Sequence, residues 1–211
     1  MTMKMSADRR SYARWIAMPL SVVVLVGVLL ISWDRCWKAR AGGQAATTKV
    51  QSHDVVSKMV DYVEQGRYDD AVQIGLRSLQ GGPSDEAIYQ QIADIYLIRA
   101  HKDPDKREQW VAKAASYTDK ALSLNSKDRD VAGVHLFQDA RAFEMAGDLS
   151  TLARCGYYER ARKLLEDRVP LLQGDGINLE GKVFPLAPLR KENENVLAEV
   201  KAKAANAGCK K

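Results

Sequence analysis

The chain has 211 residues, of which 46% are hydrophobic and 28% are charged, and it carries a formal net charge of +5. This length suits one domain of ordinary size, and the composition argues against a chain that is disordered throughout. Three cysteines are too few, and odd in number, for a fold that is built on disulfides.

The net charge comes entirely from the first 40 residues, which hold seven basic and two acidic side chains. Residues 41–211 therefore hold 25 of the 32 basic and 25 of the 27 acidic residues and are formally neutral. A nucleic-acid-binding domain usually carries a basic patch on its folded part. The high isoelectric point is thus no evidence for such a patch, and we predict no nucleic-acid partner.

A transmembrane helix is predicted after a basic N-terminal tail at residues 1–14. Residues 15–33, WIAMPLSVVVLVGVLLISW, contain no charged side chain, and a helix of this length rises about 28 Å, close to the ~30 Å hydrocarbon core of a bilayer. Trp15, Trp33 and Trp37 lie at or just beyond its ends, the interfacial position that indole rings prefer. Cleavage as a signal peptide is disfavoured, because charged residues separate the apolar run from the small-residue triplet at 39–41.

The flanking charges favour an N-terminus that stays in the cytoplasm. Four basic residues precede the predicted span and three follow it closely, and positive charge is retained on the cytoplasmic side. We therefore predict a juxtamembrane linker at 34–51 and a repeat domain outside the cytoplasm, which in a bacterium is the periplasm. Membrane lipids would contact the chain through the N-terminal helix.

From residue 52 to residue 172 apolar residues recur at helical spacing, as in Val55, Met59 and Tyr62. The segment GRYDDAVQIGLRSLQGGP, residues 66–83, resembles the second helix of a tetratricopeptide repeat, whose 34-residue unit is a helix–turn–helix. The landmark positions of three such repeats are Val55, Met59, Tyr62, Ala71, Leu79 and Pro83; Tyr89, Ile92, Ala93, Tyr96, Ala114, Ala121 and Leu122; Leu136, Ala140, Phe143, Ala161 and Leu165. The first two aromatic landmarks are 34 residues apart, the period of the family.

The predicted fold class is therefore all-α: the transmembrane helix, then a tetratricopeptide-like α-solenoid of about three helix pairs, then a C-terminal capping helix. Small residues such as Ala71, Ala93, Ala114, Ala140 and Ala161 would let paired helices approach closely. Each pair would leave an apolar face exposed until the next pair stacks on it.

The sequence departs from the family pattern between the helices of repeats two and three. The landmark aromatic and alanine are 9 residues apart in repeat one but 18 apart in the other two. The extra residues fall around 101–109 and 147–155. They predict either inserted loops on one edge of the solenoid or longer helices joined by ordinary turns. In addition, Lys58 and Asp139 occupy positions where a large apolar residue is usual.

Glycines and prolines predict a connector at residues 173–189. A last helix is expected within 190–211, with Val196, Leu197 and Val200 on one face, where it would cap the array. The apolar segment 183–189 would pack over the last repeat, or, as a bolder alternative, lie in the concave groove as an internal ligand.

No sequence motif indicates catalysis, a metal or a cofactor, so we predict a protein that is not an enzyme. Phosphate-binding, dinucleotide, serine-hydrolase and zinc-protease motifs are absent. His53, His101 and His135 are far apart and lack the spacing of metal ligands. Cys155 is either a free thiol or, if the domain is extracytoplasmic, a partner for Cys209 in a disulfide.

The resemblance also implies a partner-binding groove on the inward face of the first helix of each pair. Carried over by register, its residues are Val56, Val60, Val63, Gln90, Asp94, Leu97, Phe137, Arg141 and Glu144. Arg141 is the only Lys, Arg or Asn among them, which disfavours the clamp that some family members form around a terminal carboxylate. The alternative is that about half of these residues are core.

The layout is similar to that of the bacterial translocon-associated tetratricopeptide proteins, which implies a membrane-held adaptor for a protein or peptide partner in assembly or export. The alternative is a structural subunit of a membrane complex, which would use the solenoid for oligomerisation with a second copy of itself.

Overall fold

The computed structural model describes residues 44–81, 85–124, 129–174, 176–179 and 182–209. Residues 48–211 form one compact unit, and the packing below is that of this unit. The predicted tail at 1–14, the predicted span at 15–33, and Trp15, Trp33 and Trp37 lie outside the described residues. Among the helices that the structure does describe, none has both the length and the apolar character needed to cross a bilayer.

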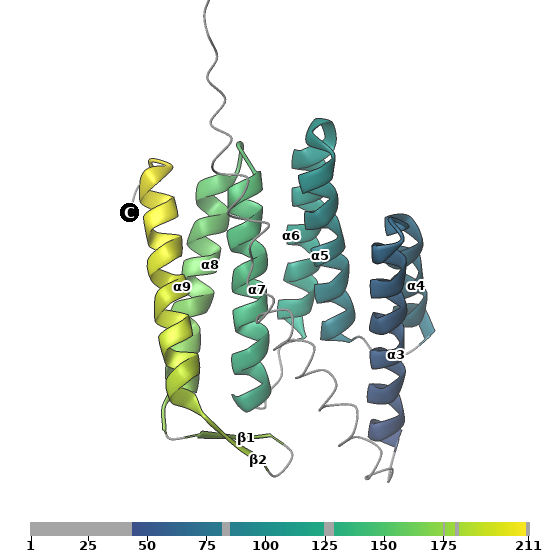
Figure 1. The fold of residues 1–211 in the computed structure, drawn as a ribbon, viewed down its shortest axis with the longest axis horizontal. Coiled ribbons are helices and arrows are strands. Elements are labelled where there is room, and N and C mark those ends of the chain that lie inside the picture. The colour runs from purple at the N-terminus through teal and green to yellow at the C-terminus, as the bar shows by residue number, and fades with distance from the viewer. Residues whose placement is uncertain (1–43, 82–84, 125–128, 175, 180–181, 210–211) are drawn as a thin grey trace, which may run out of the picture. The chain divides into compact units, whose positions relative to one another are not determined.

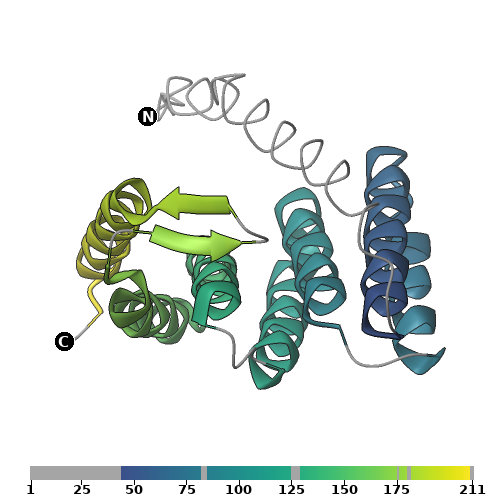
Figure 2. The same ribbon diagram turned by 90° about the horizontal axis from the view of Figure 1, so that it is seen from below.

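The described chain is helical except for one short hairpin, which agrees with the predicted all-α class (Figure 1). Successive helices stand side by side in an α-solenoid arrangement (Figures 1 and 2). In chain order the elements are α3 (Gln44–Glu64), α4 (Tyr68–Gly81), α5 (Glu86–Lys102), the 3-10 turn η1 (Pro104–Lys106), α6 (Arg107–Ser123), α7 (Arg129–Leu149), α8 (Arg154–Arg168), the 3-10 turn η2 (Val169–Leu172), β1 (Gly176–Leu179), β2 (Lys182–Pro185) and α9 (Leu186–Asn206).

The nine extra residues in repeats two and three lengthen helices rather than forming loops. Both α5 and α6 are 17 residues long, whereas α4 has 14. Only Asp103 and the turn η1 join α5 to α6, and the side chain of Asp103 accepts a hydrogen bond from the backbone N–H of Lys106 (3.3 Å). Between α7 and α8 the connection is equally short, at residues 150–153. The interpretation of longer helices with ordinary turns is therefore confirmed.

The core is built from small residues and aromatics, as the periodicity predicts. Tyr96 is buried and its ring stacks on both Trp110 and Tyr117, at centroid distances of 5.8 and 5.7 Å. Phe143 is fully buried and stacks on Tyr157. All five alanines that were expected to allow close approach are buried: Ala71, Ala93, Ala114, Ala140 and Ala161.

The connector after η2 contains an antiparallel hairpin, which the sequence did not predict. Gly176 of β1 pairs with Pro185 of β2 in the register, and β1 contacts α7 (Figure 2). Leu186, at the start of α9, is fully buried against Leu172 and Leu189. The described part of segment 183–189 therefore packs beside the end of the last repeat, as the simpler alternative stated.

Helix α9 covers the third helix pair and begins four residues before the predicted range. Val200 is fully buried among Phe143 and other core residues of α7 and α8. A buried polar group also joins these helices, because the Arg168 guanidinium donates to the carbonyl of Gly133 (2.6 Å) and to Asn193 Oδ1 (3.3 Å). A disulfide between Cys155 and Cys209 links the first turn of α8 to the end of α9.

Gly147 on α7 provides a test of the close approach between α7 and α8. A Cβ atom at this position would lie 2.6 Å from ring atoms of Tyr158. We expect Gly147→Ala to lower the free energy of unfolding by about 1–3 kcal/mol through overpacking, although alanine is the better helix former. Urea unfolding followed by circular dichroism measures the change.

Gly156 on α8 is the matched control for this substitution, because a Cβ there would meet nothing within 4 Å. Gly156→Ala is expected to raise the free energy of unfolding by up to about 1 kcal/mol through helix propensity alone. Equal effects of the two alanines would contradict the close contact.

Candidate functional site

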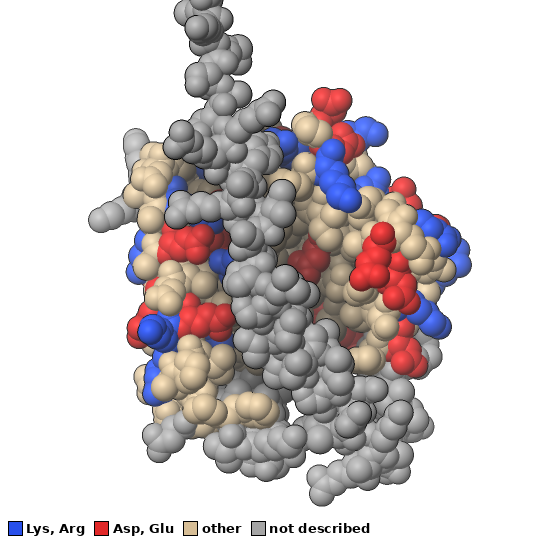
Figure 3. All heavy atoms as spheres, in the orientation of Figure 1, with Lys and Arg blue, Asp and Glu red and all other residues tan. Residues whose placement is uncertain are grey.

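Polar residues gather on the facing sides of α5 and α7, the first helices of the second and third pairs. Glu86, Gln90 and Asp94 lie one helical turn apart along α5, and His135 and Asp139 lie one turn apart along α7. We call these five residues the α5–α7 strip. Acidic side chains are visible in the hollow between these two helices (Figure 3).

Two rungs connect the helices across the strip. The side-chain amide of Gln90 donates a hydrogen bond to Asp139 Oδ1 (3.2 Å). One turn earlier on both helices, His135 Nδ1 lies 2.9 Å from Glu86 Oε1, although the alignment is not that of a good hydrogen bond. The two contacts set the register of α5 against α7.

The third turn of the strip has no second rung. Continued by four residues, the register places position 143 opposite Asp94, and Phe143 is fully buried in the core. Within the described residues Asp94 has neither a hydrogen-bond nor an ion-pair partner, and its side chain is exposed. Asp139 is only 1% exposed, and its Oδ2 has no hydrogen-bond partner in the same part of the chain.

The electrostatics of the strip follow from this environment. Burial raises the pKa of Asp139 to about 7; the hydrogen bond from Gln90 opposes this shift, and the negative charge of Glu86 adds to it. Asp94 keeps accessible surface, but protein surrounds it on several sides, as expected in a hollow. This desolvation raises its pKa to about 6. The strip therefore holds carboxyl groups that change protonation near neutral pH.

The other predicted groove residues have different positions. On α3, Val60 is 38% exposed, whereas Val56 and Val63 are half-buried and pack against the first core cluster. Leu97 is 1% exposed and belongs to that core. Phe137 is half-buried beneath the guanidinium of Arg168, which lies 4.3 Å from the centre of its ring. The structure thus places Leu97 in the core rather than on a partner-binding surface.

Arg141 and Glu144 are used to dock α9. Glu144 is buried, pairs with Arg141, and accepts a hydrogen bond from Lys203 Nζ of α9 (2.7 Å). Lys203 Nζ also lies 2.7 Å from Asp148 Oδ2, and these bonds raise its pKa against the opposing effect of burial. Glu144 is therefore inside an intramolecular ion-pair network and is not accessible to a partner.

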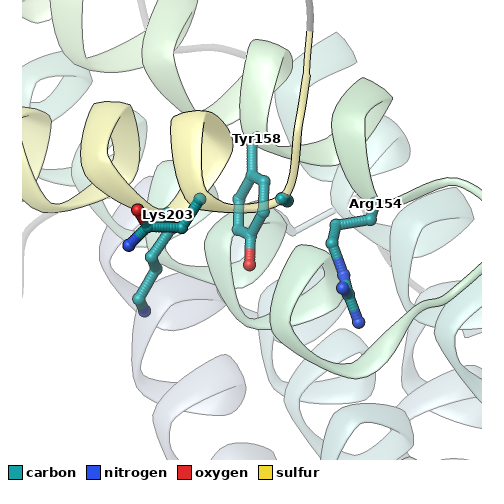
Figure 4. A pocket seen from close by; sticks show the side chains of 5 residues that line it. Arg154, Tyr158 and Lys203 are labelled. Carbon is teal, nitrogen blue, oxygen red and sulfur yellow. The ribbon is translucent and has the colours of Figure 1, made fainter.

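A pocket of about 250 Å³ lies beside this network and is lined by Arg154, Tyr158, Lys203, Asn206 and Ala207 (Figure 4). Its polar groups already have partners: the Tyr158 hydroxyl donates to Asp148 Oδ1 (2.7 Å), and Arg154 Nε donates to the carbonyl of Ser150 (3.0 Å). Burial, together with the bond to Asp148, raises the pKa of Tyr158 to about 12. The pocket is thus part of the interface between α8 and α9.

No constellation of catalytic or metal-binding residues occurs in the part of the chain that the structure describes. In these residues no group of three or more His, Cys, Asp and Glu side chains could hold a metal ion. His53 on α3 and His101 on α5 are exposed and lie on different helices from His135.

Sequence reasoning identified Gln90 and Asp94 but did not connect them with residues of α7. His135 looked like an ordinary helix residue, and Asp139 looked like a departure from the repeat pattern. One signal was available: Gln90 and Asp139 are 49 residues apart, and so are Glu86 and His135. Two polar pairs at the same separation on helical spacing indicate facing rows.

A comparison with protein-family models finds no match for the chain. The sequence likewise matches no curated protein.

Proposed function

We propose that this chain is a membrane-anchored, tetratricopeptide-like adaptor that binds a segment of another protein on the face made by α3, α5 and α7. The observation that carries the proposal is the α5–α7 strip, where a buried acceptor and an exposed acid lie together in a hollow without partners among the described residues. Polar groups that are left unsatisfied in a fold indicate a function other than stability.

The helix pairing and the 34-residue spacing of the first two aromatic landmarks support the repeat assignment. The uncharged run at 15–33 and its flanking tryptophans support the anchor. The disulfide between Cys155 and Cys209 supports a repeat domain outside the cytoplasm, since disulfides persist in oxidising compartments. An export or assembly machine at the membrane is the setting that this combination favours.

Site-specific photocrosslinking in intact membranes tests the proposal. A photoreactive amino acid at Val60, which is exposed on α3, is expected to give an adduct with a distinct protein. The same group at Ala112, exposed on α6 in the second helix of its pair, is the control and is expected to give none. An adduct only with a second copy of the chain would favour the structural subunit. Adducts from Ala112 but not from Val60 would overturn the proposed face.

A further inference from the structure

We infer that the α5–α7 strip binds a cationic side chain, a lysine or an arginine, which the partner segment inserts between Asp94 and Asp139. This inference rests on the proposed function and specifies the chemistry of the segment that the face recognises.

The first argument is the buried oxygen of Asp139. Its Oδ1 accepts from Gln90, but Oδ2 is buried and has no hydrogen-bond partner in the described part of the chain. A buried acceptor without a donor costs about 1–3 kcal/mol. Gln90 lies one turn from both Glu86 and Asp94, so this carboxyl group lies opposite the middle of the acidic row. A donor that enters the row would satisfy Oδ2.

The second argument is a comparison with Glu144 on the same helix. That carboxylate is also buried, and two cations of the chain, Arg141 and Lys203, contact it. Asp139 is buried to the same degree, yet the only base beside it is His135, which already faces Glu86. A buried carboxylate is stable when it is paired, so the structure leaves the position of a cation vacant here.

The third argument selects the kind of cation. Too few metal ligands converge anywhere in the described residues to hold a metal ion. Asp94 is exposed and Asp139 is 1% exposed, so the ligand must reach from the surface inward. Lysine and arginine do this, because their apolar stems can be buried while the backbone that carries them stays at the surface.

Protonation of the strip adds a pH dependence. Glu86 and Asp94 face Asp139 from α5, and His135 lies beside it on α7. Raising the pH from 6 to 8 ionises Asp94 and Asp139, whose pKa values are about 6 and 7, and removes any positive charge from His135. All three changes favour a bound cation, so binding should tighten over this interval.

Fluorescence anisotropy with two peptides tests the inference on the full-length protein in detergent micelles. One labelled nonapeptide alternates alanine and arginine, and the other replaces each arginine by citrulline, its neutral isostere. We expect the arginine peptide to bind at least 10-fold more tightly. The double variant Asp94→Asn, Asp139→Asn should lose this preference, whereas Asp167→Asn, which removes one exposed charge from α8, should change the affinity less than twofold.

Equal affinity for the two peptides, no binding of the arginine peptide at millimolar concentration, or an unchanged preference in the double variant would each overturn the inference. The photocrosslink from Val60 separates this failure from failure of the proposed function. A crosslink that forms equally in the wild type and the double variant would leave the adaptor standing without its cation site. Loss of the crosslink in the double variant, with Asp167→Asn unaffected, supports the inference.

Discussion

Removing the disulfide by the double substitution Cys155→Ser, Cys209→Ser is expected to lower the free energy of unfolding by about 2–4 kcal/mol. The bridge closes a loop whose ends are 54 residues apart and fixes both ends of the α8–α9 interface. Without it the unfolded chain gains conformational freedom. Helix α9 also covers the last repeat, whose apolar face it must shield from water. Urea unfolding of the full-length protein in detergent micelles, followed by circular dichroism, measures the loss.

Reduction of the wild type by a dithiol is the matched control, because it breaks the same bond without changing the sequence. The reduced wild type should unfold at the urea concentration of the double variant, and the variant itself should not respond to the reductant. A double variant as stable as the oxidised wild type would show that the bridge contributes nothing. Free Cys155 and Cys209 thiols in protein taken directly from membranes would contradict the extracytoplasmic location.

Much of the fold could be predicted because it depends on local signals. The first helix pair is specified by Tyr62 and Ala71 at the family spacing and by Gly66 between the helices. Gly66 adopts a positive φ of 74°, and Arg67 N–H donates to the carbonyl of Tyr62 (2.8 Å), which ends α3. Such features need no knowledge of distant residues.

Other features of the fold could not be predicted because distant contacts decide them. The length of α5 and α6 depends on the stacking of Tyr96 on Trp110, which lies inside the segment interpreted as a possible insertion. The hairpin consists of two four-residue strands with a glycine and a proline at their ends, too short to show an alternating pattern.

The candidate site shows the same division. Register within a repeat placed Gln90 and Asp94 on the right face of α5. It could not show that Lys203, 59 residues beyond Glu144, engages that residue, because Lys203 lies on a helix outside the repeats. Nor could register show that Asp139 lacks a cation, since this depends on everything that packs around it.

The substitution Asp139→Asn is expected to raise the free energy of unfolding at pH 8 by about 2–4 kcal/mol. Burial gives Asp139 a pKa of about 7 in the folded state, against 3.8 for an unperturbed aspartate. Between these values the folded protein keeps a proton that the unfolded chain has released. Stability is therefore complete below pH 4 and is lost as the pH rises through 7, at up to about 1.4 kcal/mol per pH unit. Asparagine cannot ionise, and its side-chain oxygen can still accept the hydrogen bond from Gln90.

Urea unfolding of the full-length protein between pH 5 and pH 8 measures this effect as the difference between the wild type and Asp139→Asn. The difference should grow with pH, whereas Asp167→Asn, an exposed residue of α8, should stay within about 0.5 kcal/mol of the wild type throughout. A variant that is less stable at pH 8, or a difference that does not change with pH, would contradict the buried carboxylate. If the same substitution stabilises the fold and also removes the preference for arginine, Asp139 is present because it binds a cation and at a cost to stability. That combination is expected of a residue in a binding site and not of one that serves only the fold.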